Sequence, residues 1–269
     1  METIGFLGGG NMAEALIKGI TAAKVYPAEN ILVSDIRPER LDFLAKQYGV
    51  KTAEANSELA AKVDILVLSV KPQSMTEALQ SIKDTFRADT LIISIAAGIK
   101  VTNIADVLGD VAIVRVMPNT PALIGEGASA LFANDKAKPM LDKAKSIFSA
   151  VGEAVVVDNE DLIDAVTAVS GSGPAYYFLL MEEMIKAASE LGLPEDTARK
   201  LVLQTAKGAA LLAAEANKKG ESPTELRKKV TSPGGTTEAA LKVFTEGKFG
   251  PLINTAIKRA RDRSRELAG

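Results

Sequence analysis

Two glycine-rich segments carry the residue types with the clearest chemical meaning. The first, Gly8-Gly9-Gly10-Asn11-Met12-Ala13, matches the pattern G-x-G-x-x-A, follows the apolar stretch Thr3–Gly8 and opens a helical pattern. There Gly8 permits a tight turn, Gly10 lets backbone approach a pyrophosphate, and Ala13 permits close helix–strand packing. Free N–H groups and the partial positive charge at a helix N-terminus bind phosphates. The segment therefore predicts a dinucleotide site, against the alternative of a purely structural glycine turn.

The second segment is a run of glycines and hydroxyls between two helical patterns, Ser232-Pro233-Gly234-Gly235-Thr236-Thr237. Consecutive backbone N–H groups there form a nest for a small carboxylate or phosphate. Two further loops, Ser170–Pro174 and Met117–Pro121 with Asn119, have similar small polar residues. Each such loop has a plainer interpretation as a helix cap in a turn. Together they favour a substrate pocket in a cofactor-binding protein.

The residues after the second apolar strand select between related cofactors. The sequence there is Ser34-Asp35-Ile36-Arg37. Asp35 is placed to accept the ribose hydroxyls of NAD. Arg37, helped by Ser34, is placed to pair with the extra phosphate of NADP. The two signals conflict, and Arg37 is also interpretable as a solvated charge at the start of a helix.

Two more loops follow apolar strands and belong to the same expected site. They are Ser69-Val70-Lys71-Pro72 and Ala96-Ala97-Gly98. In an open α/β sheet the ligand lies across the carboxyl ends of the strands, so these loops should flank the ribose and nicotinamide. Lys71 is a candidate phosphate or substrate contact, although a loop lysine is more often simply exposed.

The elements that must position these loops alternate between strand and helix over the first 160 residues. Apolar, β-branched runs between helices predict a parallel sheet covered on both faces. The expected strands are Thr3–Gly8, Ile31–Asp35, Val63–Val70, Thr90–Ala96, Val111–Met117, Ala128–Phe132 and Ala154–Val157, with helices at Asn11–Ala23 and Pro38–Tyr48.

From Asp161 onward the strand patterns vanish and helical spacing takes over. We predict two domains: 1–160, a Rossmann-type dinucleotide-binding domain, and 161–269, an all-helical domain. The alanine-rich stretch Ala206–Ala216 suggests intertwined subunits, or an ordinary helix packed within one monomer. The expected helices are Pro174–Leu191, Glu195–Asn217, Pro223–Lys229, Thr237–Glu246 and Leu252–Leu267.

Composition limits the chemistry that these domains can perform. Among 269 residues there is no histidine, cysteine or tryptophan, aromatic residues are 4%, and the net charge is −2. This excludes Ser-His-Asp triads and thiolate nucleophiles and disfavours zinc sites and base-stacking nucleic-acid platforms. We expect a cytoplasmic protein without a metal, a membrane span or a nucleic-acid partner. The basic stretch Lys258–Arg265 is interpreted as a solvated helix face.

Several of these motifs in order resemble the pyrroline-5-carboxylate reductase family over essentially the whole chain. The most specific piece is Pro223–Phe244, with sequence PTELRKKVTSPGGTTEAALKVF. Supporting pieces are Gly8–Ala13, Val70–Pro72, Ala96–Gly98, Met117–Pro121 and Asp161–Tyr176. The resemblance implies reduction of 1-pyrroline-5-carboxylate to L-proline with NAD(P)H, the last step of proline biosynthesis. It further implies a dimerising C-terminal domain, with dimers often assembled into a decamer.

The resemblance also implies residue roles. The Ser232–Thr237 loop is expected to hold the substrate carboxylate through backbone N–H groups, with the Thr237 hydroxyl as the catalytic group near the ring nitrogen. The expected substrate-binding residues are Ser232, Gly234, Gly235, Thr236, Thr237, Asn119 and Glu160. The expected cofactor-binding residues are Leu7, Gly8, Gly9, Gly10, Asn11, Met12, Ser34, Asp35, Arg37, Asn56, Ser69, Val70, Lys71, Pro72, Ile95, Ala96 and Ala97. The cofactor is expected to be NADPH, with NADH as the alternative because Asp35 departs from the small neutral residues common in the family.

The implied reaction agrees with the composition. A protonated cyclic imine is already a hydride acceptor, so neither a metal nor a histidine is needed, and positioning carries much of the catalysis. Two other classes remain open from the residues. One is a hydroxyacid dehydrogenase, which commonly uses a histidine or a well-placed lysine, with Lys186 and Lys207 as candidates. The other is a non-catalytic dinucleotide sensor.

Overall fold

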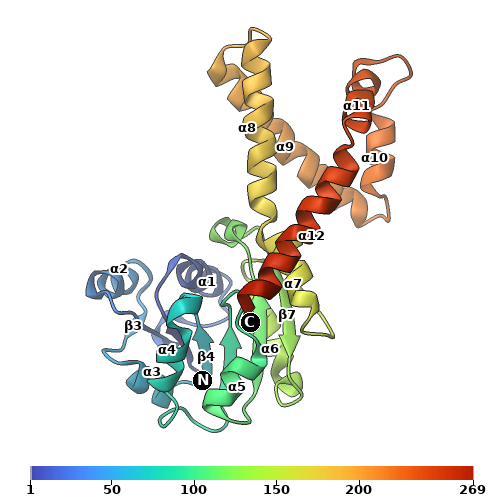
Figure 1. Ribbon diagram of the computed structural model, residues 1–269. Coiled ribbons are helices and arrows are strands. Elements are labelled where there is room, and N and C mark those ends of the chain that lie inside the picture. Colours follow the sequence, from blue (N-terminus) through green and yellow to red (C-terminus); the bar gives the residue numbers. More distant parts are fainter. Residues whose placement is uncertain (1, 269) are drawn as a thin grey trace. The chain divides into compact units, whose positions relative to one another are not determined.

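A computed structural model describes residues 2–268 of the chain. The chain divides into two compact units: one runs to Pro174 and includes the segment from Arg259 onward, and the other is Ala175–Lys258 (Figure 1). No helix within residues 2–268 is both long enough and apolar enough to cross a bilayer.

The first unit is built on one eight-stranded sheet with the order β3-β2-β1-β4-β5-β6-β7-β8. All neighbouring strands are parallel except β6 and β7, which are antiparallel. The order reverses direction beside β1, which is the topological switch point where open α/β sheets bind ligands. The strands are β1 (Ile4–Leu7), β2 (Ile31–Ser34), β3 (Lys51–Thr52), β4 (Ile65–Leu68), β5 (Leu91–Ser94), β6 (Ile113–Met117), β7 (Gly127–Ala133) and β8 (Gly152–Val156).

The central strands are buried on both faces because successive side chains point to opposite sides of the sheet. In β4, Ile65 and Val67 enter one apolar core, whereas Leu66 and Leu68 enter the other. Helices α1 and α6 supply side chains to the first core, and α3, α4 and α5 supply side chains to the second. The predicted Rossmann-type sheet covered on both faces is confirmed.

The helices of this unit occupy the connections between the strands. They are α1 (Asn11–Ala22), α2 (Pro38–Tyr48), α3 (Asn56–Lys62), α4 (Met75–Gln80), α5 (Val101–Leu108), α6 (Leu141–Ser149) and α7 (Leu162–Val166). Short turns of 3₁₀-helix are η1 (Ala28–Asn30), η2 (Pro72–Ser74), η3 (Thr120–Ile124) and η4 (Lys138–Met140), and η5 (Thr167–Gly171) is a π-helical turn.

The second unit contains helices and no strand among its described residues. They are α8 (Gly173–Glu190), α9 (Glu195–Asn217), α10 (Pro223–Lys229), α11 (Thr236–Glu246) and α12 (Phe249–Ala268), where α8 and α12 also extend into the first unit. Three predicted helix starts were late: α8 begins at Gly173, α11 at Thr236 and α12 at Phe249. In α12 the proline at 251 lies in the first turn, where its missing N–H costs no helical hydrogen bond.

The second unit lacks an apolar core of its own. Its buried apolar side chains are those of Ala198, Val202 and Ala216. In contrast, Tyr177 and Phe178 on α8 are 67% and 61% exposed, and Leu211 and Leu212 on α9 are also exposed. Apolar surface of this extent marks an interaction site. It favours the interpretation of the alanine-rich helix as part of an assembly.

The last turns of α12 are anchored on the first unit by a buried carboxylate. Asp164 of α7 is 4% exposed, and its Oδ1 accepts a hydrogen bond of 2.7 Å from the Ser264 hydroxyl. Arg265 lies nearby, with its Nε 3.8 Å from Asp164 Oδ2. The positive charge of the basic stretch of α12 is compensated in part within the helix, because Arg259 and Arg263 both pair with Glu266. This agrees with its interpretation as a solvated face.

Replacing Ser264 by alanine should lower the free energy of unfolding by about 1–3 kcal/mol, because the buried Asp164 carboxylate loses a hydrogen-bond donor. Ser146→Ala is the matched control, since the exposed Ser146 hydroxyl bonds only to the Lys143 carbonyl within its own helix. Urea denaturation followed by circular dichroism measures both variants. Equal stability of the two would show that the Asp164 contact does not stabilise the first unit.

Candidate active site

The glycine turn after β1 is forced by a close approach of two backbone segments. Gly8 has φ +102°, and a methyl group on its Cα would lie 2.9 Å from the carbonyl oxygen of Ser69. The Gly8 N–H donates to the Ser34 carbonyl at 2.8 Å, and the Ser69 hydroxyl donates to the Gly8 carbonyl at 2.7 Å. The carboxyl ends of β1, β2 and β4 therefore meet at Gly8, and no side chain can be accommodated there.

Gly10 differs from Gly8 in what surrounds it. A methyl group at Gly10 would meet no atom within 4 Å, so the space in front of this residue is open. Gly10 precedes α1 without any side-chain cap, and its carbonyl accepts the first helical bond, from Glu14 N–H at 2.9 Å. The N–H groups of Asn11 and Met12 precede this first helical donor and so have no acceptor within the helix. Open space before uncapped N–H groups fits the pyrophosphate of a dinucleotide.

Asp35 is turned inward. Its Oδ2 accepts from the Gly9 N–H at 2.8 Å and from Arg37 Nη2 at 3.2 Å. Its Oδ1 accepts from the backbone N–H and the Nε of Arg37, both at 3.0 Å. The Asp35 side chain is 7% exposed and that of Arg37 is 52% exposed. Because the carboxylate already accepts four hydrogen bonds, a ribose hydroxyl would have to displace one of them.

These contacts keep Asp35 ionised. Burial alone would raise its pKa, but the hydrogen bonds from Arg37 and from the Gly9 N–H outweigh burial and leave the pKa below its ordinary value. The carboxylate therefore stays negative at neutral pH and holds the glycine turn and Arg37 together.

A second network, which the sequence analysis missed, holds the other side of the Gly9 peptide. Arg40 of α2 donates through Nε to the Gly9 carbonyl and pairs with the carboxylate of Glu14 on α1. The Tyr48 hydroxyl donates to Glu14 at 2.8 Å. Burial favours a raised pKa for Glu14, but Arg40 and Tyr48 lower it overall, so this residue stays charged. No motif spacing indicates these residues, because the network depends on how α1 and α2 pack.

Two other predicted cofactor residues bond to each other. The buried Ser34 hydroxyl donates to Asn56 Oδ1 at 2.8 Å, and Asn56 Nδ2 donates to the Ser81 hydroxyl at 3.0 Å. They support the end of β2 from the side of α3. The loops after β4 and β5 lie at the same carboxyl edge of the sheet, where Lys71 and Ala97 are exposed and Ala96 is buried.

Asn119 and Glu160 are both engaged within the first unit. Asn119 donates to the Ser170 carbonyl at 3.1 Å and accepts from the Ala128 N–H at 2.9 Å, which ties the loop after β6 to β7 and to the π-helical turn η5. Glu160 Oε1 accepts from the Val101 N–H at 2.8 Å and from Arg115 at 2.9 Å. The Arg115 side chain is 3% exposed, so this ion pair is buried on the arginine side.

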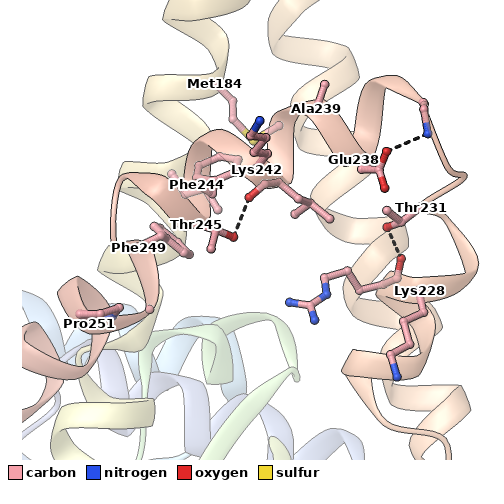
Figure 2. Close-up of a pocket in the computed structure, with 16 residues that line it drawn as sticks. Met184, Lys228, Thr231, Glu238, Ala239, Lys242, Phe244, Thr245, Phe249 and Pro251 are labelled. Atoms are coloured by element: carbon pink, nitrogen blue, oxygen red, sulfur yellow. Dashed lines mark hydrogen bonds between the residues drawn. The ribbon is translucent and has the colours of Figure 1, made fainter.

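In the second unit the predicted substrate loop is a tight turn followed by a helix. The Gly235 N–H donates to the Ser232 carbonyl at 3.0 Å, with proline and then Gly234 (φ +72°) between them. This is a type II turn, whose third residue requires a positive φ. The Gly234 N–H donates to Glu238 Oε2 at 2.7 Å (Figure 2). Both glycine N–H groups thus have acceptors inside the loop.

The donors that remain belong to the first turn of α11. Its first helical bond runs from the Ala239 N–H to the Gly235 carbonyl at 3.1 Å, and no side chain caps the helix. The N–H groups of Thr236 and Thr237 precede that bond and so have no helical acceptor. They are the groups of this loop best placed to receive an anion.

A hollow of about 1330 Å³ lies beside this loop in the second unit. Gly234, Gly235 and Glu238 line one side of it, whereas Thr236 and Thr237 are not among its lining residues. Leu180, Met184, Phe244 and Phe249 give it an apolar wall (Figure 2). Its lining also includes the charged side chains of Arg227, Lys228, Glu238 and Lys242. The predicted residues thus form two groups: the nucleotide set meets at one sheet edge of the first unit, and the Ser232–Thr237 loop belongs to the second.

Comparison with known proteins assigns the chain to a family. Residues 160–267 match the family model described as "Pyrroline-5-carboxylate reductase dimerisation", and residues 3–98 match that described as "NADP oxidoreductase coenzyme F420-dependent". The pyrroline-5-carboxylate reductase of Pseudomonas aeruginosa is 47% identical over 267 residues, which cover 98% of this chain and 96% of that protein. The chain belongs to the pyrroline-5-carboxylate reductase family.

Solved structures of pyrroline-5-carboxylate reductases have the same fold. The enzyme from Coxiella burnetii is 41% identical, with a TM-score of 0.94 over 100% of this chain and 99% of that one. The Plasmodium falciparum pyrroline carboxylate reductase, solved with NADP bound, is 31% identical, with a TM-score of 0.87 over 100% and 98%. The resemblance that the sequence motifs predicted is confirmed. Within residues 2–268 no group of three or more acidic, histidine or cysteine side chains is arranged to hold a metal ion.

The two glycines of the turn after β1 should respond differently to replacement by alanine. Gly10→Ala should keep the stability of the wild type but weaken dinucleotide binding at least tenfold, because its methyl group enters only the open space in front of α1. Gly8→Ala should lower the melting temperature, because its methyl group meets the Ser69 backbone. Thermal unfolding and calorimetric titration with NADPH separate these effects. Unchanged affinity in Gly10→Ala would contradict the placement of the phosphates.

Proposed function

We propose that this chain reduces 1-pyrroline-5-carboxylate to L-proline with NADPH, the last step of proline biosynthesis. The observation that carries the proposal is the 47% identity to a pyrroline-5-carboxylate reductase over 98% of the chain. Two features of the molecule support it: the open phosphate cradle at Gly10, and the uncapped N–H groups at the start of α11.

The proposed chemistry needs little from acid or base side chains. When bound, the reduced nicotinamide would supply a hydride to the carbon of the imine, whose nitrogen already carries a proton. The C=N bond thereby becomes a C–N bond. The protein binds the ring carboxylate, orients the ring and excludes water. We assign the carboxylate to the N–H groups of Thr236 and Thr237, with Ser232, Gly234 and Gly235 shaping the loop. The Thr237 hydroxyl is the proposed hydrogen-bond partner of the ring nitrogen.

The other predicted site residues receive two kinds of role in this proposal. Leu7, Gly8, Gly9, Gly10, Asn11 and Met12 surround the pyrophosphate, and the loops containing Ser69–Pro72 and Ile95–Ala97 flank the ribose and nicotinamide. Ser34 and Asn56 hold the end of β2, Asn119 ties the loop after β6 to β7 and η5, and Glu160 accepts from the Val101 N–H and from Arg115. In place of the direct substrate contact expected for Asn119 and Glu160, we propose that these two residues position the site. This assigns nucleotide binding to residues 1–160 and substrate binding and dimerisation to residues 161–269.

The proposal extends to the assembly and the compartment. The exposed apolar faces of α8 and α9 and the match to a dimerisation domain support a homodimer. A pentamer of such dimers is the higher assembly that the family resemblance implies. A cytoplasmic location is proposed on the cysteine-free composition from which it was expected.

The decisive experiment measures NADPH oxidation by the purified chain with 1-pyrroline-5-carboxylate, for the wild type and for Thr237→Ala. The wild type should show imine-dependent oxidation. The variant should lose roughly 10²-fold in turnover, because it lacks the hydroxyl at the ring nitrogen, while its affinity for NADPH stays nearly intact. No oxidation by a folded, dinucleotide-binding wild type would favour a dehydrogenase or sensor. Wild-type turnover in Thr237→Ala would remove the role of that residue.

Cofactor preference should depend on Arg37. The inward Asp35 carboxylate leaves the outer edge of the Arg37 guanidinium exposed, where it is placed to meet the extra phosphate of NADPH. Arg37→Ala should weaken NADPH binding about tenfold, because the variant loses the charge-assisted contact with the extra phosphate. NADH lacks that phosphate, so its binding should be nearly unchanged. Arg87→Ala is the control, since Arg87 is also exposed and paired with aspartates, Asp64 and Asp89. Equal losses for both nucleotides would contradict this assignment.

A further inference from the structure

A carboxylate follows directly after the substrate loop, beside the N–H groups proposed to bind the substrate carboxylate. Glu238 occupies the third position of α11, two residues after the first helical residue, Thr236. Its side chain turns back and accepts the Gly234 N–H at 2.7 Å (Figure 2). An acidic side chain in the first turn also interacts favourably with the helix dipole. Glu238 therefore closes the loop onto the helix that follows it.

The contact decides which donors the loop presents. Gly234 has a positive φ, and its residue type allows many backbone conformations when it is unrestrained. The 3.0 Å bond between the Gly235 N–H and the Ser232 carbonyl fixes one end of the turn, and the Glu238 contact fixes the Gly234 peptide. With both glycine N–H groups satisfied, the free donors are the adjacent N–H groups at the start of α11.

We propose that Glu238 is a positioning residue for the substrate carboxylate. It holds the Gly234 peptide so that the N–H groups of Thr236 and Thr237 stay aligned for the anion. Glu238 does not itself bind the substrate, and its negative charge opposes the approach of the anion while its hydrogen bond prepares the loop. This role rests on the proposed function, because it concerns the same loop.

Three substitutions at position 238 separate these contributions. Glu238→Gln keeps a carbonyl oxygen at the same reach but removes the charge. Glu238→Asp keeps a charge at the helix N-terminus but shortens the side chain by one methylene, so it no longer reaches the Gly234 N–H. Glu238→Ala removes both. Glu246→Ala, at the far end of α11, is the control, because Glu246 is exposed and makes only a 3.9 Å contact with Lys242.

The KM for 1-pyrroline-5-carboxylate should follow the reach of the side chain and not its charge. We expect KM to rise about tenfold in Glu238→Asp and Glu238→Ala, the low end of what a hydrogen bond to a charged group contributes. In Glu238→Gln, KM should stay at or below the wild-type value, because the acceptor remains and the opposing charge is gone. The turnover number and the NADPH dissociation constant should change less than about twofold in every variant.

Two results would overturn the proposal. One is a wild-type KM in both Glu238→Asp and Glu238→Ala. The other is a lower turnover number in the variants together with a raised KM that is also found in Glu238→Gln. That result would indicate a general structural role. If Glu238→Ala fails to fold, the aspartate and glutamine variants make the same comparison.

Amide hydrogen exchange of residues 231–240 gives a readout that does not depend on catalysis. Exchange at Gly234 should be faster in Glu238→Asp and Glu238→Ala than in the wild type and in Glu238→Gln. Equal exchange in all four proteins would show that the contact does not hold the loop. If the wild type lacks reductase activity, the proposed function and the positioning role both fall, while the exchange pattern still reports whether Glu238 holds the Gly234 peptide.

Discussion

The contact between the Gly8 backbone and the Ser69 carbonyl is the constraint on which the nucleotide half of the molecule depends. It brings the ends of β1 and β4 so close that a methyl group at Gly8 would lie 2.9 Å from that oxygen. The same turn directs the chain into α1 with its first N–H groups uncapped. Sheet order, helix start and phosphate cradle thus follow from one place where only glycine fits.

Around that turn the protein uses charge to fix the backbone. The Gly9 peptide is held at its N–H by Asp35 and at its carbonyl by Arg40, and each of these side chains has a partner of opposite charge. In the second unit Glu238 holds the Gly234 peptide in a similar way. In both loops a carboxylate satisfies a glycine N–H, and the N–H groups in the first turn of the following helix remain for a ligand.

Local features of the sequence were sufficient to predict the alternating strands and helices, the glycine turn and the change to an all-helical half. These depend on side-chain periodicity and on residues with special backbone freedom, both visible in a single sequence. The strand β7 was predicted, but its antiparallel direction and the two-residue β3 were not, because pairing direction and short edge strands leave no periodic signal. The inward rotation of Asp35, the Arg40–Glu14–Tyr48 network and the Glu238 contact arise from side-chain orientations and packing, which residue spacing does not specify.

The anchoring of α12 through Ser264 and Asp164 has a consequence for biosynthesis. The first unit contains residues from both ends of the described chain, with the whole second unit between them in sequence. During translation its sheet emerges early, but the Asp164 carboxylate has no Ser264 hydroxyl until that residue has left the ribosome. The first unit therefore completes this contact only after the whole helical segment has been made.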